Sequence, residues 1–399
     1  MKKILLLGGS AQQIVAIETS KRLGYYTVLC DYLSDNPGQY TADKFYLIST
    51  TDKEAVLKVA ENEKVDGVLA YASDPAAPTA AYVAEKLGLY TNPYDSVRTL
   101  CNKNIFRKFL SENGFNTPKA YVYKNTEEAI KLKGNIDLPV IVKPVDSSGS
   151  KGVTVLRSWD GLKDAVDFAF SFSRSHQIIA EEFIEKKHPY LVGGDIFIAD
   201  GKVILWGLLN CHRDGLANPL VPVGKSYPPE LIDEDIKIVK DTLQSIVDKL
   251  DIRFGAMNVE LIIDNKNRVW PIDVGPRSGG NMIPDLLGMI FNVDVVEMCV
   301  KAAMGEQIDI EPKNDGFFYA THNLHSTQAG IYEDICFSDE IKPFIIKKYL
   351  YKKEGDYVEF FDNASKALGI IFLKFESNEQ MNQILSKINK HITVKLKNV

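Results

Sequence analysis

The segment from residue 254 to residue 281 constrains the fold most, because two short apolar runs flank a polar turn there. The turn is Asp264-Asn265-Lys266-Asn267, so the segment predicts a β-hairpin. Glu260 interrupts the first run and Asp273 the second. A carboxylate on a buried strand is costly unless something pairs with it. Two carboxylates on paired strands can share a divalent cation, and their hard oxygens suit Mg²⁺. The alternative is a hairpin with two edge carboxylates paired to Lys or Arg.

The residues directly after this hairpin suit phosphoryl chemistry. Arg277 supplies a fixed positive charge, and Gly279-Gly280 allow the backbone to approach a ligand closely. A metal ion, a fixed cation and free amides are what a transferring phosphoryl group needs. We therefore interpret residues 254–281 as the centre of a candidate active site.

Composition narrows the class of protein. A chain of 399 residues suits roughly two to four domains. Its formal net charge of −6, without a basic stripe, argues against a nucleic-acid partner. Five scattered cysteines without a CxxC pair favour reduced thiols in a cytosolic protein over disulfides or a zinc site. No apolar stretch is long enough to cross a membrane, so we expect no membrane partner.

Residues 1–95 alternate between strand-like and helix-like segments, which predicts a doubly wound α/β domain of Rossmann-like type. Strands are expected at Lys3–Leu7, Thr27–Asp31 and Val68–Tyr71, and a helix at Gln12–Leu23. The turn Gly8-Gly9-Ser10 lacks the full GxGxxG pattern, so it is weak evidence for dinucleotide binding. Asp74 follows an expected strand at the sheet edge where ligands bind. It either binds a substrate amine or caps the next helix.

The next segment carries two lysines and a loop rich in glycine and serine. Lys103 lies in an expected helix, Ser96–Asn113, and Lys143 ends an expected strand, Leu138–Pro144. The loop Asp146–Gly152, DSSGSKG, offers free backbone amides that can cradle phosphate oxygens. It is not a P-loop, because the GxxxxGK[ST] spacing is missing and a strand follows. The alternative is an ordinary hairpin loop beside a solvated lysine.

Later segments supply further candidates. The expected strand Ile178–Ile184 carries Glu181 and Glu182, which either hold a ligand amine or face solvent. Cys211–Tyr227 is expected to be an irregular loop and a substrate lid, carrying His212, Arg213 and Lys225. Long helices are expected at Glu230–Leu250 and Pro284–Met304.

Residues 311–399 are expected to form a separate small α/β unit. A strand is expected at Lys366–Phe375, a helix at Asn378–Ile388 and a last strand at Ile392–Leu396. His322 and His325 have the spacing of one helix face. Without a third ligand this pair is weak evidence for a metal, so we expect it to serve packing or substrate contacts.

Taken in order, these motifs resemble the ATP-grasp superfamily, and within it the carboxylate–amine ligase branch, which holds amino-acid ligases and carbamoyl-phosphate-synthase-like single-chain proteins. The resemblance covers roughly residues 1–310 and rests on Lys103, VIVKP with Lys143, DSSGSKG, AEEFI, NVELI with Glu260, and PIDVGPRSGGN. It implies a Rossmann-like domain over residues 1–95, an ATP-grasp small subdomain with a linker helix over 96–185, a large subdomain with the metal site over 186–310, and a C-terminal domain over 311–399.

The resemblance also implies roles for individual residues. The α- and β-phosphates of ATP would be bound by Lys103 and Lys143, under a flap made by Ser147, Ser148, Gly149, Ser150 and Gly152. Adenine and ribose would be bound by Glu181 with its neighbour Glu182, by the backbone of Phe183 and Ile184, and by His188. Glu260 and Asp273 would hold Mg²⁺, with Mn²⁺ as the alternative metal. Arg277 would stabilise the transferring phosphate, and Arg213 is the second candidate catalytic residue.

Two positions depart from the family pattern. Asp273 stands where the second metal carboxylate is usually glutamate, and Gly275 stands where asparagine is common. These departures leave open whether one or two metal ions bind. They also keep open a nucleotide-binding regulatory module that has lost catalysis.

The activity implied by the resemblance is ligation. A carboxylate takes the γ-phosphate of ATP, and an amine then displaces phosphate from the acyl-phosphate to form an amide. The alternative within enzymes is a phosphoribosylglycinamide synthetase, although its NTGGMG-like loop is not found; biotin carboxylase fits less well because the chain is short. Proteins that look like this are commonly homodimers.

Overall fold

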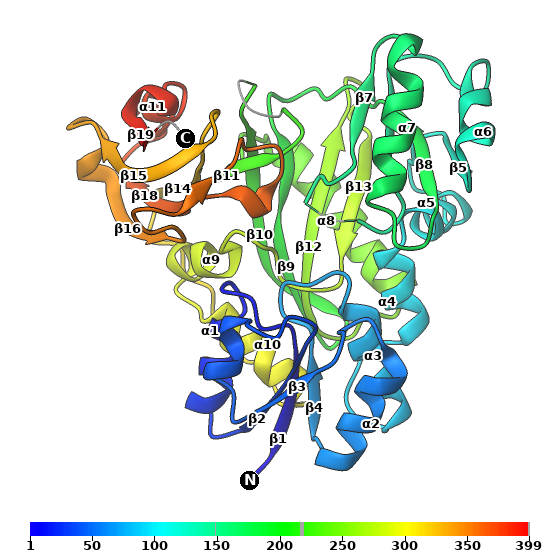
Figure 1. The fold of residues 1–399 in the computed structure, drawn as a ribbon, viewed down its shortest axis with the longest axis vertical. Coiled ribbons are helices and arrows are strands. Elements are labelled where there is room, and N and C mark those ends of the chain that lie inside the picture. The colour runs from blue at the N-terminus through cyan, green and yellow to red at the C-terminus, as the bar shows by residue number, and fades with distance from the viewer. Residues whose placement is uncertain (148, 216–218, 398–399) are drawn as a thin grey trace.

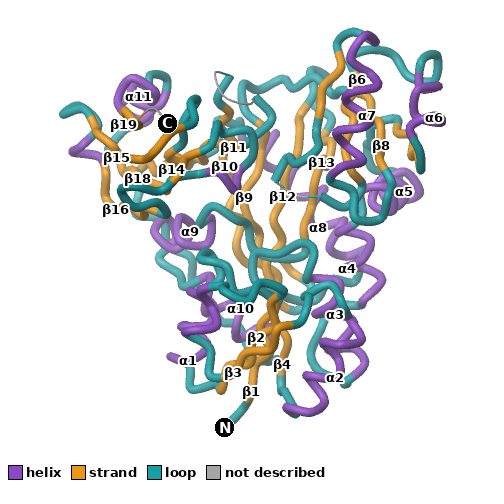
Figure 2. The backbone as a smooth tube through the Cα atoms, in the orientation of Figure 1, coloured by secondary structure: helices purple, strands orange, loops and turns teal. Residues whose placement is uncertain are grey.

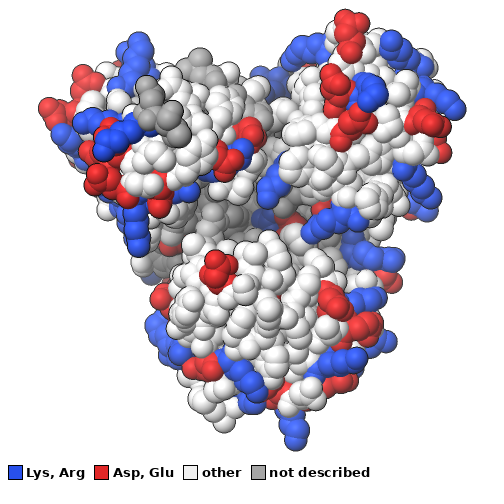
Figure 3. Space-filling model, viewed as in Figure 1, with Lys and Arg blue, Asp and Glu red and all other residues white. Residues whose placement is uncertain are grey.

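The computed structural model describes residues 1–147, 149–215 and 219–397. The N-terminal residues lie at the bottom of the view, a long sheet runs through the middle, and two smaller regions lie above it (Figure 1). These parts surround a hollow with Lys and Arg side chains at its rim (Figure 3). The fold is mixed α/β, as the sequence predicts.

The N-terminal region is a parallel sheet covered by helices, as expected for a doubly wound domain. The strands β1 (Lys3–Leu7), β2 (Tyr26–Asp31), β3 (Lys44–Leu47) and β4 (Gly67–Leu69) lie in the order β3-β2-β1-β4. The helices are α1 (Ile14–Arg22), α2 (Lys53–Glu63) and α3 (Ala77–Lys86). The apolar side chains of β1 and β2 are buried, because helices pack on both faces of a parallel sheet.

A linker and a small antiparallel sheet follow. The linker helices are α4 (Tyr94–Cys101) and α5 (Lys103–Glu112); the small region contains β5 (Ala120–Tyr123), α6 (Thr126–Ala129), β6 (Val140–Pro144), β7 (Thr154–Leu156), α7 (Leu162–Ser171) and β8 (Ile178–Glu182). Its strand order is β5-β8-β6-β7. The single helix expected over Ser96–Asn113 is wrong, because the chain is extended at Asn102. The Asn102 side chain accepts a hydrogen bond from the Ile105 amide and so caps a second helix.

The large sheet forms the centre of the molecule (Figure 2). Its strands are β9 (Leu191–Ala199), β10 (Lys202–Arg213), β11 (Pro222–Tyr227), β12 (Gly255–Ile263), β13 (Val269–Gly275), β14 (Phe318–Leu324), β16 (Ile345–Leu350) and β18 (Gly369–Phe375), in the order β13-β12-β9-β10-β11-β14-β18-β16. The helices α8 (Asp233–Lys249), α9 (Ile283–Phe291) and α10 (Val295–Ala303) accompany it. The predicted hairpin is confirmed as β12–β13, and β9 and β10 form another antiparallel pair.

Two expectations for this region are wrong. Cys211–Tyr227 is not an irregular loop, because β10 continues to Arg213 and pairs with β11. Val221 and Val223 are both buried, and their alternating positions favour a strand. The helix expected over Pro284–Met304 is divided into α9 and α10, where Asn292 adopts a left-handed conformation.

The C-terminal residues do not pack as an isolated layer. β14, β16 and β18 extend the large sheet across the boundary expected at residue 311. A second sheet, β17 (Tyr357–Val358), β15 (Gly330–Phe337) and β19 (Ile392–Lys397), lies beside helices α11 (Asn378–Leu385) and α12 (Ile388–His391). His322 lies on β14, so the helix face expected for it and His325 is wrong. In the described part of the chain, we find no helix of the length and hydrophobicity that crossing a membrane requires.

Candidate active site

Glu260 and Asp273 are direct partners across the β12–β13 ladder. Residues opposite each other in an antiparallel pair point to the same face, so both carboxylates face the hollow side of the hairpin. Glu260 accepts a hydrogen bond from Arg213 at 3.3 Å, and the Lys225 ammonium lies 3.7 Å from the same oxygen. Asp273 forms a looser ion pair, with Lys103 at 3.6 Å, and its side chain is 48% exposed. The two acids are therefore neighbours on one face of the hairpin, but Glu260 is paired with two cations and Asp273 is more exposed.

Charge pairing keeps Glu260 ionised. Burial alone would raise the pKa of its carboxyl group, but the charges of Arg213 and Lys225 outweigh burial and lower the pKa. A metal ligand must be deprotonated, so this arrangement keeps Glu260 ready to bind a cation.

The donor set fits one or more magnesium ions held jointly with phosphate. Two carboxylates share a face, and no group of three or more His, Cys, Asp or Glu able to hold a metal exists among the described residues. Mg²⁺ in nucleotide sites is typically bound by one or two carboxylates, with phosphate and water oxygens filling the other positions. Glu260 and Asp273 are therefore the residues that would hold the metal.

Lys103 and Lys143 approach the same region from the small sheet and its linker. Lys103 donates a hydrogen bond to the Ser147 carbonyl at 3.0 Å, so it lies against the predicted flap. Lys143 is buried and forms an ion pair with Glu181 at 2.6 Å. Burial lowers the pKa of Lys143, and the Glu181 charge opposes that shift.

Arg107 is a residue of this network that the sequence did not single out. Its Nε donates to Glu181 at 2.8 Å, and its guanidinium also reaches the Ile272 carbonyl at 2.7 Å. Burial would raise the pKa of Glu181, but Arg107 and Lys143 lower it to about 2. Arg107 has no signal in a single sequence, because an arginine on an amphipathic helix usually lies in solvent.

The geometry favours a different role for Glu181 from the expected one. Its two oxygens bind Arg107 and Lys143, and the residue is 2% exposed, so accepting from adenine would require one of these bonds to break. Glu181 is placed to position Lys143. The adenine contact stays a prediction, as do the contacts expected for Glu182 and the Ile184 backbone.

Two other expected nucleotide contacts have local partners. The Phe183 amide donates to the Pro139 carbonyl at 3.2 Å. His188 lies 2.9 Å from Asp235 through its Nε2. Each group keeps other atoms for a ligand: the Phe183 carbonyl and the remaining ring nitrogen of His188.

The predicted flap reaches the opposite wall of the hollow. The Ser150 hydroxyl donates to the Leu220 carbonyl at 2.9 Å, between β10 and β11. The Ser147 hydroxyl donates to the Lys151 carbonyl within the loop. Gly149 and Gly152 have positive φ angles of 66° and 73°, a conformation that glycine adopts without strain. Ser148 lies outside the described residues.

Arg277 forms a two-point ion pair with Asp74. Arg277 Nε donates to Asp74 Oδ1 at 2.7 Å, and its NH2 group contacts the other carboxylate oxygen. The pair joins the end of the hairpin to the N-terminal domain. A Cβ atom on Gly275 would lie 2.5 Å from Asp74 Oδ1. The absence of asparagine at position 275 therefore has a steric reason.

Asp195 on β9 is a second residue that the sequence analysis missed. Its Oδ2 accepts from the Gly279 amide at 2.7 Å and its Oδ1 from Asn258 at 2.8 Å. Burial raises the pKa of Asp195 to about 6, against the opposing effect of these bonds. Asp195 fixes the glycine turn after Arg277.

The Gly8-Gly9-Ser10 turn is occupied by the protein's own groups. The Gly9 amide donates to Asp31, and the Ser10 amide donates to Gln13. These amides are not free for a pyrophosphate, which agrees with the missing GxGxxG pattern.

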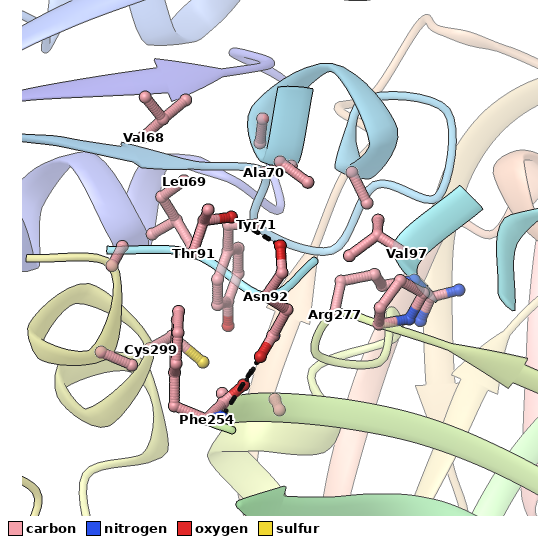
Figure 4. A pocket seen from close by; sticks show the side chains of 18 of the residues that line it. Val68, Leu69, Ala70, Tyr71, Thr91, Asn92, Val97, Phe254, Arg277 and Cys299 are labelled. Carbon is pink, nitrogen blue, oxygen red and sulfur yellow. Dashed lines mark hydrogen bonds between the residues drawn. The ribbon is translucent and has the colours of Figure 1, made fainter. Parts of the chain in front are cut away.

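A small cavity of about 90 Å³ lies behind Arg277, where the N-terminal domain meets the large sheet (Figure 4). Tyr71 and Cys299 are among its lining residues. Beside it, Asn92 donates to the Phe254 carbonyl at 2.9 Å and accepts from the Phe254 amide (Figure 4). Asn92 therefore fastens the linker to the start of β12.

Comparison with known proteins gives a family match for the central part of the chain. Residues 136–285 match the ATP-grasp domain family. The chain therefore carries an ATP-grasp domain over these residues. It is 29% identical over 311 residues to a formate-dependent phosphoribosylglycinamide formyltransferase of Bacillus velezensis, covering 76% of this chain and 77% of that protein. It is 24% identical over 324 residues to the C-terminal section of a carbamoyl phosphate synthase large chain of Aquifex aeolicus. That match covers 77% of this chain and 59% of the Aquifex section, so the chain spans less than two thirds of this relative.

Two solved structures share the fold along the whole chain. An L-amino acid ligase from Bacillus licheniformis has a TM-score of 0.83 at 20% identity and covers 100% of this chain and 99% of its own. A phosphoribosylglycinamide synthetase from Anaerococcus prevotii has a TM-score of 0.75 at 22% identity, covering 99% and 100%. The C-terminal residues are thus part of the shared architecture.

Proposed function

We propose that this ATP-grasp protein is an ATP-dependent carboxylate–amine ligase that works through an acyl-phosphate. ATP and a carboxylate give ADP and the acyl-phosphate, and an amine then forms the amide and releases phosphate. The observation that carries the proposal is the direct pairing of Glu260 and Asp273 within a ring of cations. Paired acids that hold a metal beside fixed positive charges suit phosphoryl transfer.

The nucleotide would lie between the small sheet and the β12–β13 hairpin. Lys103 and Lys143 would neutralise the phosphates, and Glu181 with Arg107 would hold Lys143 in place. The flap would exclude water, because hydrolysis of the acyl-phosphate would waste ATP. Ser150, bonded to the Leu220 carbonyl, is the flap residue best placed to hold it closed.

Magnesium held by Glu260 and Asp273 would neutralise charge on the nucleotide phosphates. Arg213, bonded to Glu260, would keep that carboxylate oriented. Arg277 would stabilise the negative charge that develops on the transferring group, with Asp74 fixing its guanidinium. Mn²⁺, which also accepts oxygen ligands, is the alternative metal.

The substrates are a small carboxylate and a small amine. The decisive experiment measures ADP release by the pure protein with Mg-ATP, over amino-acid carboxylates paired with amino acids, glycine and phosphoribosylamine. Amine-dependent ADP release with amide formation supports the ligase. Turnover with glycine and phosphoribosylamine alone would assign the phosphoribosylglycinamide synthetase reaction instead.

Nucleotide binding without turnover for any pair would favour a regulatory module that has lost catalysis. The matched control is Lys103→Met/Lys143→Met, in which both phosphate-neutralising charges are absent. ADP release that persists in this variant comes from a contaminant rather than from this site.

A further inference from the structure

A second cavity system lies beside the C-terminal strands, away from the carboxylate pair. One cavity of about 630 Å³ is lined by residues of β14, β15 and β19 and the segments beside them, and another of about 520 Å³ lies against α12. They share Asp214, His322 and Asn389. Cavities of this size hold small organic molecules.

His322, which lines both cavities, is on the other face of the sheet from Glu260. Glu260 pairs with Gly193, which pairs with Leu209, and side chains on successive residues alternate between faces. Cys211 therefore shares the face of Glu260, and so do Lys225 and Thr321, which follow it across the ladder. His322 is the next residue along β14 and points the opposite way.

His322 is a largely buried polar side chain that borders both cavities. It is 5% exposed, lines both cavities, and makes no hydrogen bond to any residue that the structure describes. Its contact is with the ring of His325, at 5.4 Å between centroids. Burial lowers the pKa of His322 to about 3, so the ring is neutral and has one donor and one acceptor nitrogen. Such a group is costly to bury unless a ligand or water satisfies it.

The charges around the cavities are unbalanced. Of the lining acids, Asp214 is bonded to His325 and Asn389, and Glu333 forms an ion pair with Lys397. Three lining lysines have no ion pair or side-chain hydrogen bond to any described residue: Lys387, Lys390 and Lys395. The unpaired charge is positive, so the lining suits an anion.

We propose that the cavity of about 520 Å³ against α12 binds a small molecule that bears an oxyanion, either a carboxylate or a phosphate. His322 would donate to it from the floor, and Lys387 and Lys390 would neutralise it at the rim. Arg213 lines the same cavity, and its side chain bonds Glu260 through the sheet edge. The proposed site is separate from the nucleotide site and does not depend on the proposed ligase reaction.

Calorimetric titration of the full chain, saturated with Mg-ADP, tests the proposal with two probes. Inorganic phosphate and succinate are titrated separately, so that the two arms distinguish the phosphate from the carboxylate source. We expect saturable binding of one probe or both, and a loss of affinity of about a hundredfold in Lys387→Ala/Lys390→Ala, since each of the two charge-assisted hydrogen bonds contributes about tenfold. These lysines are exposed, so the variant should fold normally.

A second variant and a matched control complete the test. His322→Gln keeps hydrogen-bonding groups in a different geometry and should also weaken the probe, while Lys124→Ala/Lys131→Ala removes two exposed lysines of the small region and should change nothing. Absence of saturable binding of both probes would overturn the proposal. Equal probe affinity in the wild type and Lys387→Ala/Lys390→Ala would overturn it as well, because the probe would then occupy another site.

Discussion

Arg277 and Asp74 are 203 residues apart in the chain and form a two-point ion pair, with Arg277 Nε 2.7 Å from Asp74 Oδ1. The guanidinium of Arg277 stays protonated, whereas the carboxyl group of Asp74 can be neutral or charged, depending on its pKa. Burial alone would raise the pKa of Asp74, and the charge of Arg277 reverses this and lowers it. The ion pair therefore holds a charged arginine beside the predicted phosphate site and connects the N-terminal domain to the segment that follows the β12–β13 hairpin.

Replacing Gly275 should break this arrangement. In Gly275→Asn the new Cβ would lie 2.5 Å from Asp74 Oδ1, so the ion pair must move. We expect ligation to fall by about a hundredfold and unfolding free energy to fall by about 1–3 kcal/mol, as for other overpacked sites. Steady-state kinetics and urea unfolding measure the two effects. Gly161→Ala is the control, because its Cβ would meet nothing closer than 3.7 Å. Full activity in Gly275→Asn would show that the ion pair has no role in turnover.

Removing the guanidinium should separate nucleotide binding from chemistry. Arg277→Ala should bind ATP about as well as the wild type, while ligation falls by about a hundredfold or more, because Arg277 acts on charge that develops during transfer. It also leaves Asp74 without its partner, which lowers stability. Arg277→Ala/Asp74→Ala should recover stability without recovering ligation. If ATP affinity and ligation fall together, Arg277 is a binding residue rather than a catalytic one.

The secondary structure was most predictable where one local pattern decided it. The apolar run Lys3–Leu7 and the hairpin around Asp264–Asn267 are where the sequence places them. Helix breaks were not predictable, because the break at Asn102 depends on one capping bond inside a continuous amphipathic pattern. Nor was the joining of β14 to β11, which depends on pairing between strands about ninety residues apart.

The residues of the candidate site that could be predicted are those whose charged side chains interrupt an apolar, strand-like run of the sequence. Glu260, Asp273 and Lys143 stood out because polar groups interrupt apolar runs. Arg107 and Asp195 did not, because their significance comes from partners far along the chain. Gly275 could be noticed in the sequence because it departs from the family pattern. The reason for the glycine, the close approach of Asp74, is visible only in the structure.

Asp195 should make stability depend on pH. Its pKa is raised from an ordinary value of 3.8 to about 6, so the native state holds this proton more tightly than the unfolded state does. The stabilisation is fully present below the unfolded pKa and is lost as pH rises through about 6, a loss of about 3 kcal/mol. Asp195→Asn cannot titrate, so its stability relative to wild type should rise over this range, apart from a constant offset.

Urea unfolding of wild type and Asp195→Asn at several pH values between 4 and 8 measures this difference. Asp241→Asn is the control, because Asp241 lies in an exposed i,i+4 pair with Lys237. A constant difference between wild type and Asp195→Asn across the range would show that Asp195 titrates normally.

Loosening the flap should uncouple ATP use from ligation. Ser150→Ala removes the hydrogen bond to the Leu220 carbonyl, which contributes about 1 kcal/mol to the closed position. Water should then reach the acyl-phosphate more often, and the ratio of ADP released to amide formed should rise several-fold. Ser171→Ala, which removes a bond at the end of α7, is the control and should leave the ratio unchanged. An unchanged ratio in Ser150→Ala would mean that this bond does not hold the flap.

The carboxylate pair should set the affinity for metal. Asp273→Asn removes one of two ligands from an exposed position, so the Mg²⁺ concentration needed for half-maximal activity should rise about tenfold with little change in stability. Glu260→Gln should raise it as much and should also destabilise the fold, because it leaves Arg213 and Lys225 without their carboxylate. Paramagnetic resonance of Mn²⁺ bound with a non-hydrolysable ATP analogue measures metal affinity without turnover. Asp241→Asn, which changes an exposed acid of α8 outside the pair, is the control, and unchanged Mn²⁺ affinity in both Asp273→Asn and Glu260→Gln would place the metal elsewhere.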